Sequence, residues 1–176
     1  MFENVLILPG LWNSGPRHWQ SRWEAAHRGM VRVNQADWET PAYADWAGTL
    51  EAAVAASPAP PILVGHSSAC ALVARWSQAT SLAAKGALLV GPSDTDAPSY
   101  PAGPTGFSPM PLGRIPFPTI VVASDDDPYV SLERARLFAA SWQSELVIVP
   151  GAGHLNSDSG LGDWPDGLAL LERMQG

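Results

Sequence analysis

A serine stands where a short apolar run meets a turn of small residues. The run Ile62 to Val64 leads into Gly65-His66-Ser67-Ser68-Ala69, and a helical pattern of small residues follows at once. A strand, a Gly-X-Ser-X-Ala turn and a helix in this order are typical of a nucleophile elbow, which holds the serine hydroxyl exposed at its tip. Ala69 replaces the second glycine of the usual pattern, a difference of one methyl group. The pattern predicts a serine nucleophile for acyl transfer.

Ser67, rather than Ser68, is expected at the tip of this turn. The residue two positions before Ser68 is His66, which is too bulky for so tight a turn, whereas Gly65 stands two positions before Ser67. The helix behind Ser67 would offer free backbone N–H groups and a positive dipole end to a developing oxyanion. The alternative interpretation is a Gly/Ser-rich loop that caps an ordinary buried helix.

A serine hydroxyl is a weak nucleophile near neutral pH and needs a general base within hydrogen-bond distance. Of the four histidines, His154 lies in a loop behind a predicted strand and after an acidic cluster. The others are assigned to structural positions: His18 in the first helix, His27 at its end and His66 in the turn. We therefore expect His154 to be the base. The alternative is an ordinary histidine in a surface loop.

The triplet Asp125, Asp126 and Asp127 supplies an acid for this base. Ser, Asp and then His is the order of the catalytic groups along the chain in α/β hydrolases. Spacing alone does not choose among the three aspartates, and two of them are expected to be solvated or to cap a helix. We expect no metal site, because adjacent carboxylates in an extended loop cannot all face one ion and no His or Cys stands beside them at ligand spacing.

Six apolar runs alternate with helical patterns and must position these residues. Runs of this kind are typical of strands buried on both faces of a parallel sheet. We predict strands at Val5–Leu8, Val31–Val33, Ile62–Val64, Ala87–Val90, Thr119–Ala123 and Leu146–Val149. We predict helices that begin near Ser14–Pro16, near Thr40–Pro41, behind Ser67, at Ser131 and near Pro165. The alternation predicts one α/β domain over residues 1–176, with helices on both faces of a six-stranded, mostly parallel sheet.

The order of the strands decides whether the chemical groups meet. Right-handed crossovers and a reversal after the second strand would place the first strand beside the third. The loops behind these two strands, at Gly10 and Ser67, would then flank one crevice at the carboxyl edge, where ligands bind in open α/β sheets. The aspartate triplet and His154 follow strands that end at the same edge.

Composition disfavours several classes of partner. The formal net charge is −7 and there is no Lys/Arg cluster, so we expect no binding to nucleic acid or to an anionic membrane. No apolar run approaches the length of a membrane span, and the N-terminus lacks the basic region of a signal peptide. The single cysteine, Cys70, is expected to be a packing residue and fits a reducing, cytoplasmic location.

Residues 91–118 hold eight prolines and four glycines and cannot form a regular helix or a central strand. Loops of this length inside a compact domain are usually functional or disordered. The segment could border the site, but it lacks the pattern of a helical lid. Residues expected to contact substrate, each equally compatible with a core position, are Trp12, Phe107, Tyr129 and Leu155.

Taken together, several short motifs resemble one family over nearly the full length of the chain. They are Leu8-Pro9-Gly10, Gly15-Pro16 with His18-Trp19-Gln20, Gly65-His66-Ser67-Ser68, Asp126-Asp127-Pro128 and Gly153-His154-Leu155-Asn156. In these the chain resembles the small serine hydrolases related to retinoblastoma-binding protein 9, and most of all their bacterial branch of esterases.

The resemblance implies a lidless α/β-hydrolase fold with a Ser-Asp-His triad. In the family pattern the triad aspartate directly precedes the proline, which implies Asp127. The partner protein described for the vertebrate relative does not carry over, because no motif here supports that role.

These residues predict acyl transfer to water without a cofactor. Ser67 would attack the carbonyl of a small soluble ester, with thioesters and amides as alternatives. His154 would take the serine proton and pass it to the leaving group, and Asp127 would orient and stabilise the imidazolium. The N–H groups of Leu11 and Ser68 would form the oxyanion hole. The alternative is a binding or protein-interaction module that retains the fold without catalysis. The sequence makes no prediction of oligomeric state.

Overall fold

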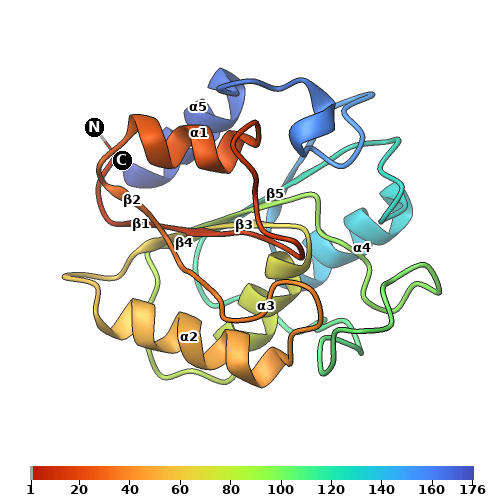
Figure 1. Ribbon diagram of the computed structural model, residues 1–176, viewed down its shortest axis with the longest axis horizontal. Helices are drawn as coiled ribbons and strands as arrows, with labels where there is room; N and C mark the ends of the chain where they lie inside the picture. Colours follow the sequence, from red (N-terminus) through yellow and green to blue (C-terminus); the bar gives the residue numbers. More distant parts are fainter. Residues whose placement is uncertain (1) are drawn as a thin grey trace.

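The computed structural model describes residues 2–176, and its centre is a six-stranded parallel sheet (Figure 1). The strands are β1 Val5–Leu8, β2 Met30–Arg32, β3 Ile62–His66, β4 Gly86–Val90, β5 Thr119–Ala123 and β6 Glu145–Ile148. Their order is β2-β1-β3-β4-β5-β6, and every neighbouring pair is parallel. The predicted α/β fold is confirmed, as is the placement of the first strand beside the third.

Helices cover both faces of this sheet, as Figure 1 shows. Helices α1 and α5 pack on one face, and α2, α3 and α4 pack on the other. Their bounds are α1 Trp19–Ala26, α2 Tyr43–Ala55, α3 Ser68–Ser77, α4 Leu132–Trp142 and α5 Pro165–Gln175, with a short 3-10 helix, η1, at Ser157–Ser159. Ser131 caps α4 and Pro165 opens α5, as predicted.

Successive side chains of each strand point to opposite faces of the sheet, so the apolar core has two layers. Val5 and Ile7 of β1 face the layer under α1 and α5, whereas Leu6 and Leu8 face the layer under α2, α3 and α4. Both sets are buried, which is why the sequence of β1 is apolar throughout instead of alternating. Burying one such side chain contributes about 1.5–3 kcal/mol, so the sheet is a firm base for the loops at its carboxyl edge.

The first helix begins later than the sequence predicts. Residues Gly15 to His18 form a turn in which the N–H of His18 donates to the carbonyl of Gly15, at 2.9 Å. The helix starts at Trp19, because the His18 side chain caps it by accepting from the N–H of Gln20. A start at Ser14–Pro16, with His18 inside the helix, was therefore the wrong expectation. Similarly, α2 starts at Tyr43 rather than at Thr40–Pro41.

The proline-rich segment 91–118 contains no helix or strand and is held by polar contacts. Arg134 of α4 donates to both carboxylate oxygens of Asp94, at 2.7 and 3.0 Å. Asp96 accepts from the hydroxyl of Ser108 and from the N–H of Met110. Charge-assisted and bidentate hydrogen bonds of this kind have well-defined geometry, so they hold the segment in one conformation beside the carboxyl edge of the sheet.

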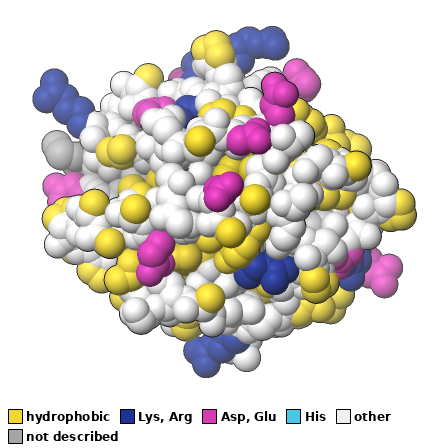
Figure 2. All heavy atoms as spheres, turned by 60° about the horizontal axis from the view of Figure 1, so that its bottom comes forward, with side chains coloured by type: hydrophobic (Ala, Val, Ile, Leu, Met, Phe, Trp, Pro, Cys, Tyr) yellow, Lys and Arg dark blue, Asp and Glu magenta, His cyan; other side chains and the backbone are white. Residues whose placement is uncertain are grey.

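Charged side chains are scattered over the face seen in Figure 2, where the Lys and Arg side chains stand apart from one another. Among residues 2–176, no helix is both long enough and apolar enough to cross a membrane.

Candidate active site

The predicted sharp turn lies between β3 and α3, and Ser67 is its tip. The backbone of Ser67 has φ 60° and ψ −125°, a conformation that non-glycine residues rarely adopt and that costs about 1–3 kcal/mol. Small neighbours make the turn possible: a Cβ on Gly65 would lie 3.2 Å from Leu89 Cδ2 and 3.4 Å from the carbonyl oxygen of Ala69. The strain is concentrated on the residue whose hydroxyl must project from the turn.

Three loops from the carboxyl edge bring Ser67, His154 and Asp127 into one hydrogen-bonded chain. Ser67 Oγ lies 2.9 Å from His154 Nε2, and His154 Nδ1 lies 2.8 and 3.0 Å from the two carboxylate oxygens of Asp127. Asp127 Oδ1 also accepts from the N–H of Tyr129, at 2.8 Å. His154 and Asp127 are each 8% exposed, so their contact is shielded from water. The arrangement suits proton transfer from the serine hydroxyl to the imidazole.

The other two aspartates of the triplet hold the loop that carries His154. Asp125 Oδ1 accepts from the N–H of Gly151 at 2.8 Å, and Asp126 Oδ1 accepts from the N–H of Gly153 at 2.7 Å. Asp126 also accepts from the Ser124 hydroxyl at 2.6 Å. The bonds from Ser124 and from Gly153 lower the pKa of the Asp126 carboxyl. Of the three aspartates, Asp127 is thus the one that reaches the imidazole.

Two backbone segments flank Ser67 where an oxyanion would form. Ser68 is the first residue of α3, and the first N–H groups of a helix have no partner within the helix. On the opposite side, a Cβ on Gly10 would lie 2.7 Å from Ser67 Cβ and 2.9 Å from the His66 carbonyl oxygen. Only glycine allows this close approach, which places Leu11 beside the turn. Leu11 and Ser68 both line the cavity over Ser67.

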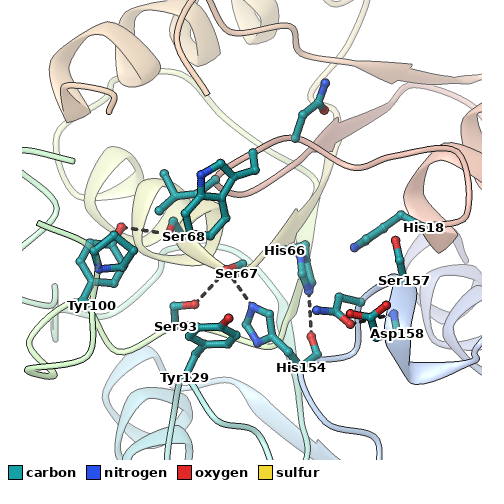
Figure 3. Close-up of a pocket in the computed structure, with 15 residues that line it drawn as sticks. His18, His66, Ser67, Ser68, Ser93, Tyr100, Tyr129, His154, Ser157 and Asp158 are labelled. Carbon is teal, nitrogen blue, oxygen red and sulfur yellow. Dashed lines mark hydrogen bonds between the residues drawn. The ribbon is translucent and has the colours of Figure 1, made fainter. Parts of the chain in front are cut away.

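This cavity has a volume of about 260 Å³ and two different ends (Figure 3). On one side of Ser67 lie Ser68, Ser93, Tyr100 and Tyr129; on the other lie His66, His18, Ser157 and Asp158. The remaining lining residues are Leu11, Trp12, Asn13, Pro101, His154 and Asn156. Tyr100 and Pro101 come from the proline-rich segment, and the Tyr100 hydroxyl lies 2.9 Å from the Ser68 hydroxyl. The segment therefore borders the site.

The four residues expected to contact substrate divide into two pairs. Trp12 and Tyr129 line the cavity and are 61% and 40% exposed. Phe107 and Leu155 lie elsewhere, contrary to the expectation. Phe107 is 1% exposed and packs edge-on against the rings of Tyr43 and Trp46 in the core. Leu155 is fully buried, and its carbonyl accepts from the indole N–H of Trp19 at 2.7 Å.

Two histidines assigned to structural positions line the cavity, and one of them, His66, contacts His154. His66 Nε2–H donates to the backbone carbonyl of His154 at 2.9 Å, so His66 holds the loop that carries His154. His18 packs edge-on against His66, with ring centroids 4.7 Å apart. Burial, reinforced by the neighbouring His154, lowers the pKa of His66 well below its usual value. Burial and then the nearby Arg32 lower the pKa of His18 to about 4. Both imidazoles are therefore neutral near pH 7.

The lowered pKa of His18 predicts a loss of stability in mild acid. Between pH 6.5 and about 4 the unfolded chain binds a proton at His18 that the folded chain does not, so stability falls as the pH drops through this range. Over the whole range, protonation of His18 should lower the free energy of unfolding by roughly 3 kcal/mol. Asn keeps a capping oxygen but does not titrate, so His18→Asn should lose about 2 kcal/mol less than the wild type between pH 7 and pH 4.5 in urea titrations. Equal losses in the two proteins would contradict the buried neutral imidazole.

A second serine, which no sequence motif indicated, lies beside Ser67. Ser93 is 4% exposed, and its Oγ lies 2.8 Å from Ser67 Oγ. It follows β4, whose carboxyl end lies beside that of β3, so its position directly after a strand was the available signal.

Cys70 is fully buried, as predicted, and burial raises the pKa of its thiol. Within residues 2–176 there is no group of three or more His, Cys, Asp or Glu side chains arranged for a metal ion.

Comparison with known proteins places the chain in a family. The family model described as serine hydrolase matches residues 5–173. The chain belongs to the serine hydrolase family. No protein of curated function matches this serine hydrolase in sequence.

Solved structures similar to this serine hydrolase share its fold over nearly all of its length. A YdeN-like hydrolase from Pectobacterium atrosepticum is 29% identical with a TM-score of 0.87, covering 98% of this chain and 90% of that one. The ydeN gene product of B. subtilis is 22% identical with a TM-score of 0.79, covering 98% of both chains. A monoacylglycerol lipase from Paleococcus ferrophilus is 12% identical with a TM-score of 0.73, covering 98% and 95%. These likenesses agree with an α/β-hydrolase fold.

Proposed function

We propose that this serine hydrolase is a carboxylesterase that cleaves small esters through a Ser67-His154-Asp127 triad and an acyl-enzyme intermediate. The observation that carries the proposal is the chain of short contacts from Ser67 Oγ through the imidazole of His154 to the Asp127 carboxylate. Nucleophile, base and orienting acid stand in the order and geometry that acyl transfer requires.

The chemistry follows from these contacts. Ser67 Oγ attacks the ester carbonyl carbon while His154 Nε2 takes its proton, and the carbonyl electron pair becomes an oxyanion facing the N–H groups of Leu11 and Ser68. Collapse of this intermediate breaks the bond to the alcohol, which leaves with the proton from Nε2. Asp127 holds the imidazole in the tautomer whose Nε2 can accept and stabilises the imidazolium. Water then repeats the sequence on the acyl-enzyme.

The size of the cavity supports a small substrate. A cavity of about 260 Å³ lies below the usual range of about 300–1,000 Å³ for ligand pockets. Its aromatic end, with Tyr100 and Tyr129, suits a short apolar group, and its other end, with Asp158, suits a polar one. An ester fits this site, and thioesters and amides use the same machinery.

A series of p-nitrophenyl esters tests the proposed substrate size. We expect hydrolysis of the acetate and butyrate esters, with kcat/KM for the palmitate ester lower by at least about tenfold because the long chain leaves the cavity. The rates would be measured from p-nitrophenol release below the micelle concentration. A preference for palmitate, or no hydrolysis of any ester by the folded protein, would contradict this proposal.

Finer assignments rest on the sequence. The matching motifs around His18, Ser67, Asp127 and His154 support a place in the branch related to retinoblastoma-binding protein 9. The net charge of −7 supports a small-molecule substrate over a nucleic-acid or membrane partner, and the single cysteine supports a cytoplasmic location. No cofactor is required for the proposed reaction.

A further inference from the structure

A second hydroxyl contacts the reacting atom from the side opposite to His154. Ser67 Oγ lies between His154 Nε2, at 2.9 Å, and Ser93 Oγ, at 2.8 Å, and Figure 3 shows both contacts. The Ser93 hydroxyl has no other hydrogen bond to residues 2–176. Within these residues, Ser67 Oγ is therefore the hydrogen-bond partner of the Ser93 hydroxyl.

The loop around Ser93 is fixed independently of Ser67. The N–H of Gly91 donates to the carbonyl of Val122 at 2.8 Å, and the N–H of Asp94 donates to the carbonyl of Tyr129 at 3.0 Å. The Asp94 carboxylate is also paired with Arg134 at 2.7 Å. A donor held by its surroundings needs no reorganisation during a reaction.

The direction of each hydrogen bond at Ser67 follows from the tautomer of His154. The Asp127 carboxylate only accepts, so Nδ1 of the neutral imidazole carries the proton and Nε2 is an acceptor. The Ser67 hydroxyl donates its single proton to Nε2. Its oxygen can then only accept from Ser93, and the Ser93 hydroxyl is the donor.

A donor to Ser67 Oγ affects the two halves of the proposed reaction differently. During acylation Oγ becomes an ester oxygen, a weaker acceptor, so the bond from Ser93 weakens. During deacylation water adds to the acyl carbon as Nε2 takes its proton, and the carbon–Oγ bond then breaks with its electron pair remaining on Oγ. Nε2 returns the proton to Oγ and the carboxylic acid leaves. Negative charge grows on Oγ in this last step, where a donated hydrogen bond strengthens.

Building on the function proposed above, we infer that Ser93 is a further catalytic residue, whose hydroxyl stabilises Ser67 Oγ as the leaving group of deacylation. The role involves no proton transfer from Ser93. It makes free enzyme more stable relative to the acyl-enzyme, and so favours release of the acyl group.

Rapid-mixing kinetics with p-nitrophenyl butyrate separate the two half-reactions. For Ser93→Ala, we expect deacylation to slow by about threefold to tenfold, the worth of one hydrogen bond, while the rate of the initial p-nitrophenol burst stays within about twofold. Mass spectrometry under turnover should show a larger fraction of butyryl-enzyme than in the wild type. Ser93→Thr, which keeps the hydroxyl, should restore deacylation. Ser99→Ala, in an exposed part of the same segment, should match the wild type.

The possible outcomes discriminate clearly. Equal slowing of acylation and deacylation in Ser93→Ala would indicate a merely structural role and overturn the inference, as would an unchanged butyryl-enzyme fraction. The rate of fluorophosphonate labelling of this variant reports whether its Ser67 turn is intact. If wild-type protein forms no acyl-enzyme at Ser67, the proposed function itself fails, which is distinct from a wild type that acylates while Ser93→Ala deacylates normally.

Discussion

Ser67→Ala is expected to lower kcat/KM for p-nitrophenyl butyrate by roughly 10⁴- to 10⁶-fold, because it removes the atom that forms the acyl-enzyme. The substitution deletes one hydroxyl and its contacts with His154 and Ser93, and leaves the buried sheet beneath unchanged. Stability should therefore change by no more than about 2 kcal/mol. Ester hydrolysis and thermal unfolding would be measured on the same preparation.

The interpretation of this variant depends on its fold. A circular dichroism spectrum and an unfolding midpoint like those of the wild type show that lost activity comes from the hydroxyl. Retention of most of the activity in folded Ser67→Ala would mean that another group is the nucleophile.

Asp127→Asn should lower kcat by about 10⁴-fold, because an amide in place of the carboxylate no longer selects the tautomer in which Nε2 accepts the serine proton. The side chain of Asp127 is fully buried against His154, so water or an ion from solvent cannot replace the carboxylate in the variant. The measurement is the pH-independent kcat for p-nitrophenyl butyrate, with KM expected to change little.

The neighbouring aspartates provide matched controls for this substitution. Asp125 is exposed and, within residues 2–176, accepts from the N–H of Gly151 alone, so Asp125→Asn should retain activity within about threefold. Asp126→Asn should have an intermediate effect, because Asp126 holds the N–H of Gly153, next to His154. If Asp125→Asn or Asp126→Asn proved as damaging as Asp127→Asn, the acid would be wrongly assigned.

The sheet was predictable because its signal is local and strong. Strands such as β1 and β4 are buried on both faces, so their sequences are apolar throughout and end at turn residues. The positions of Ser67 and His154 behind strands then followed from topology, since parallel strands end at the same edge. The choice of Asp127 needed the family resemblance, because spacing cannot separate three consecutive aspartates. In the structure, hydrogen bonds to different loop atoms separate them.

Other features depended on contacts that no local pattern records. The start of α1 is set by the His18 side chain, which caps the helix at Trp19, after the start predicted near Ser14–Pro16. Phe107 lies in a proline-rich segment without periodicity, and only the tertiary fold reveals that its ring packs on α2. The contacts of His66 with the His154 carbonyl and of Ser93 with Ser67 Oγ likewise depend on neighbouring loops.

Labelling with a fluorophosphonate tests most directly whether the loops behind β3, β5 and β6 form one reactive chain of hydrogen bonds. The probe reacts with serines activated by a base, and digestion followed by tandem mass spectrometry locates the adduct. We expect a single adduct on Ser67 in the wild type, and at least about a hundredfold slower labelling in Asp127→Asn. An adduct on a different serine, or no adduct on the folded protein, would contradict the assignment of Ser67 as an activated nucleophile.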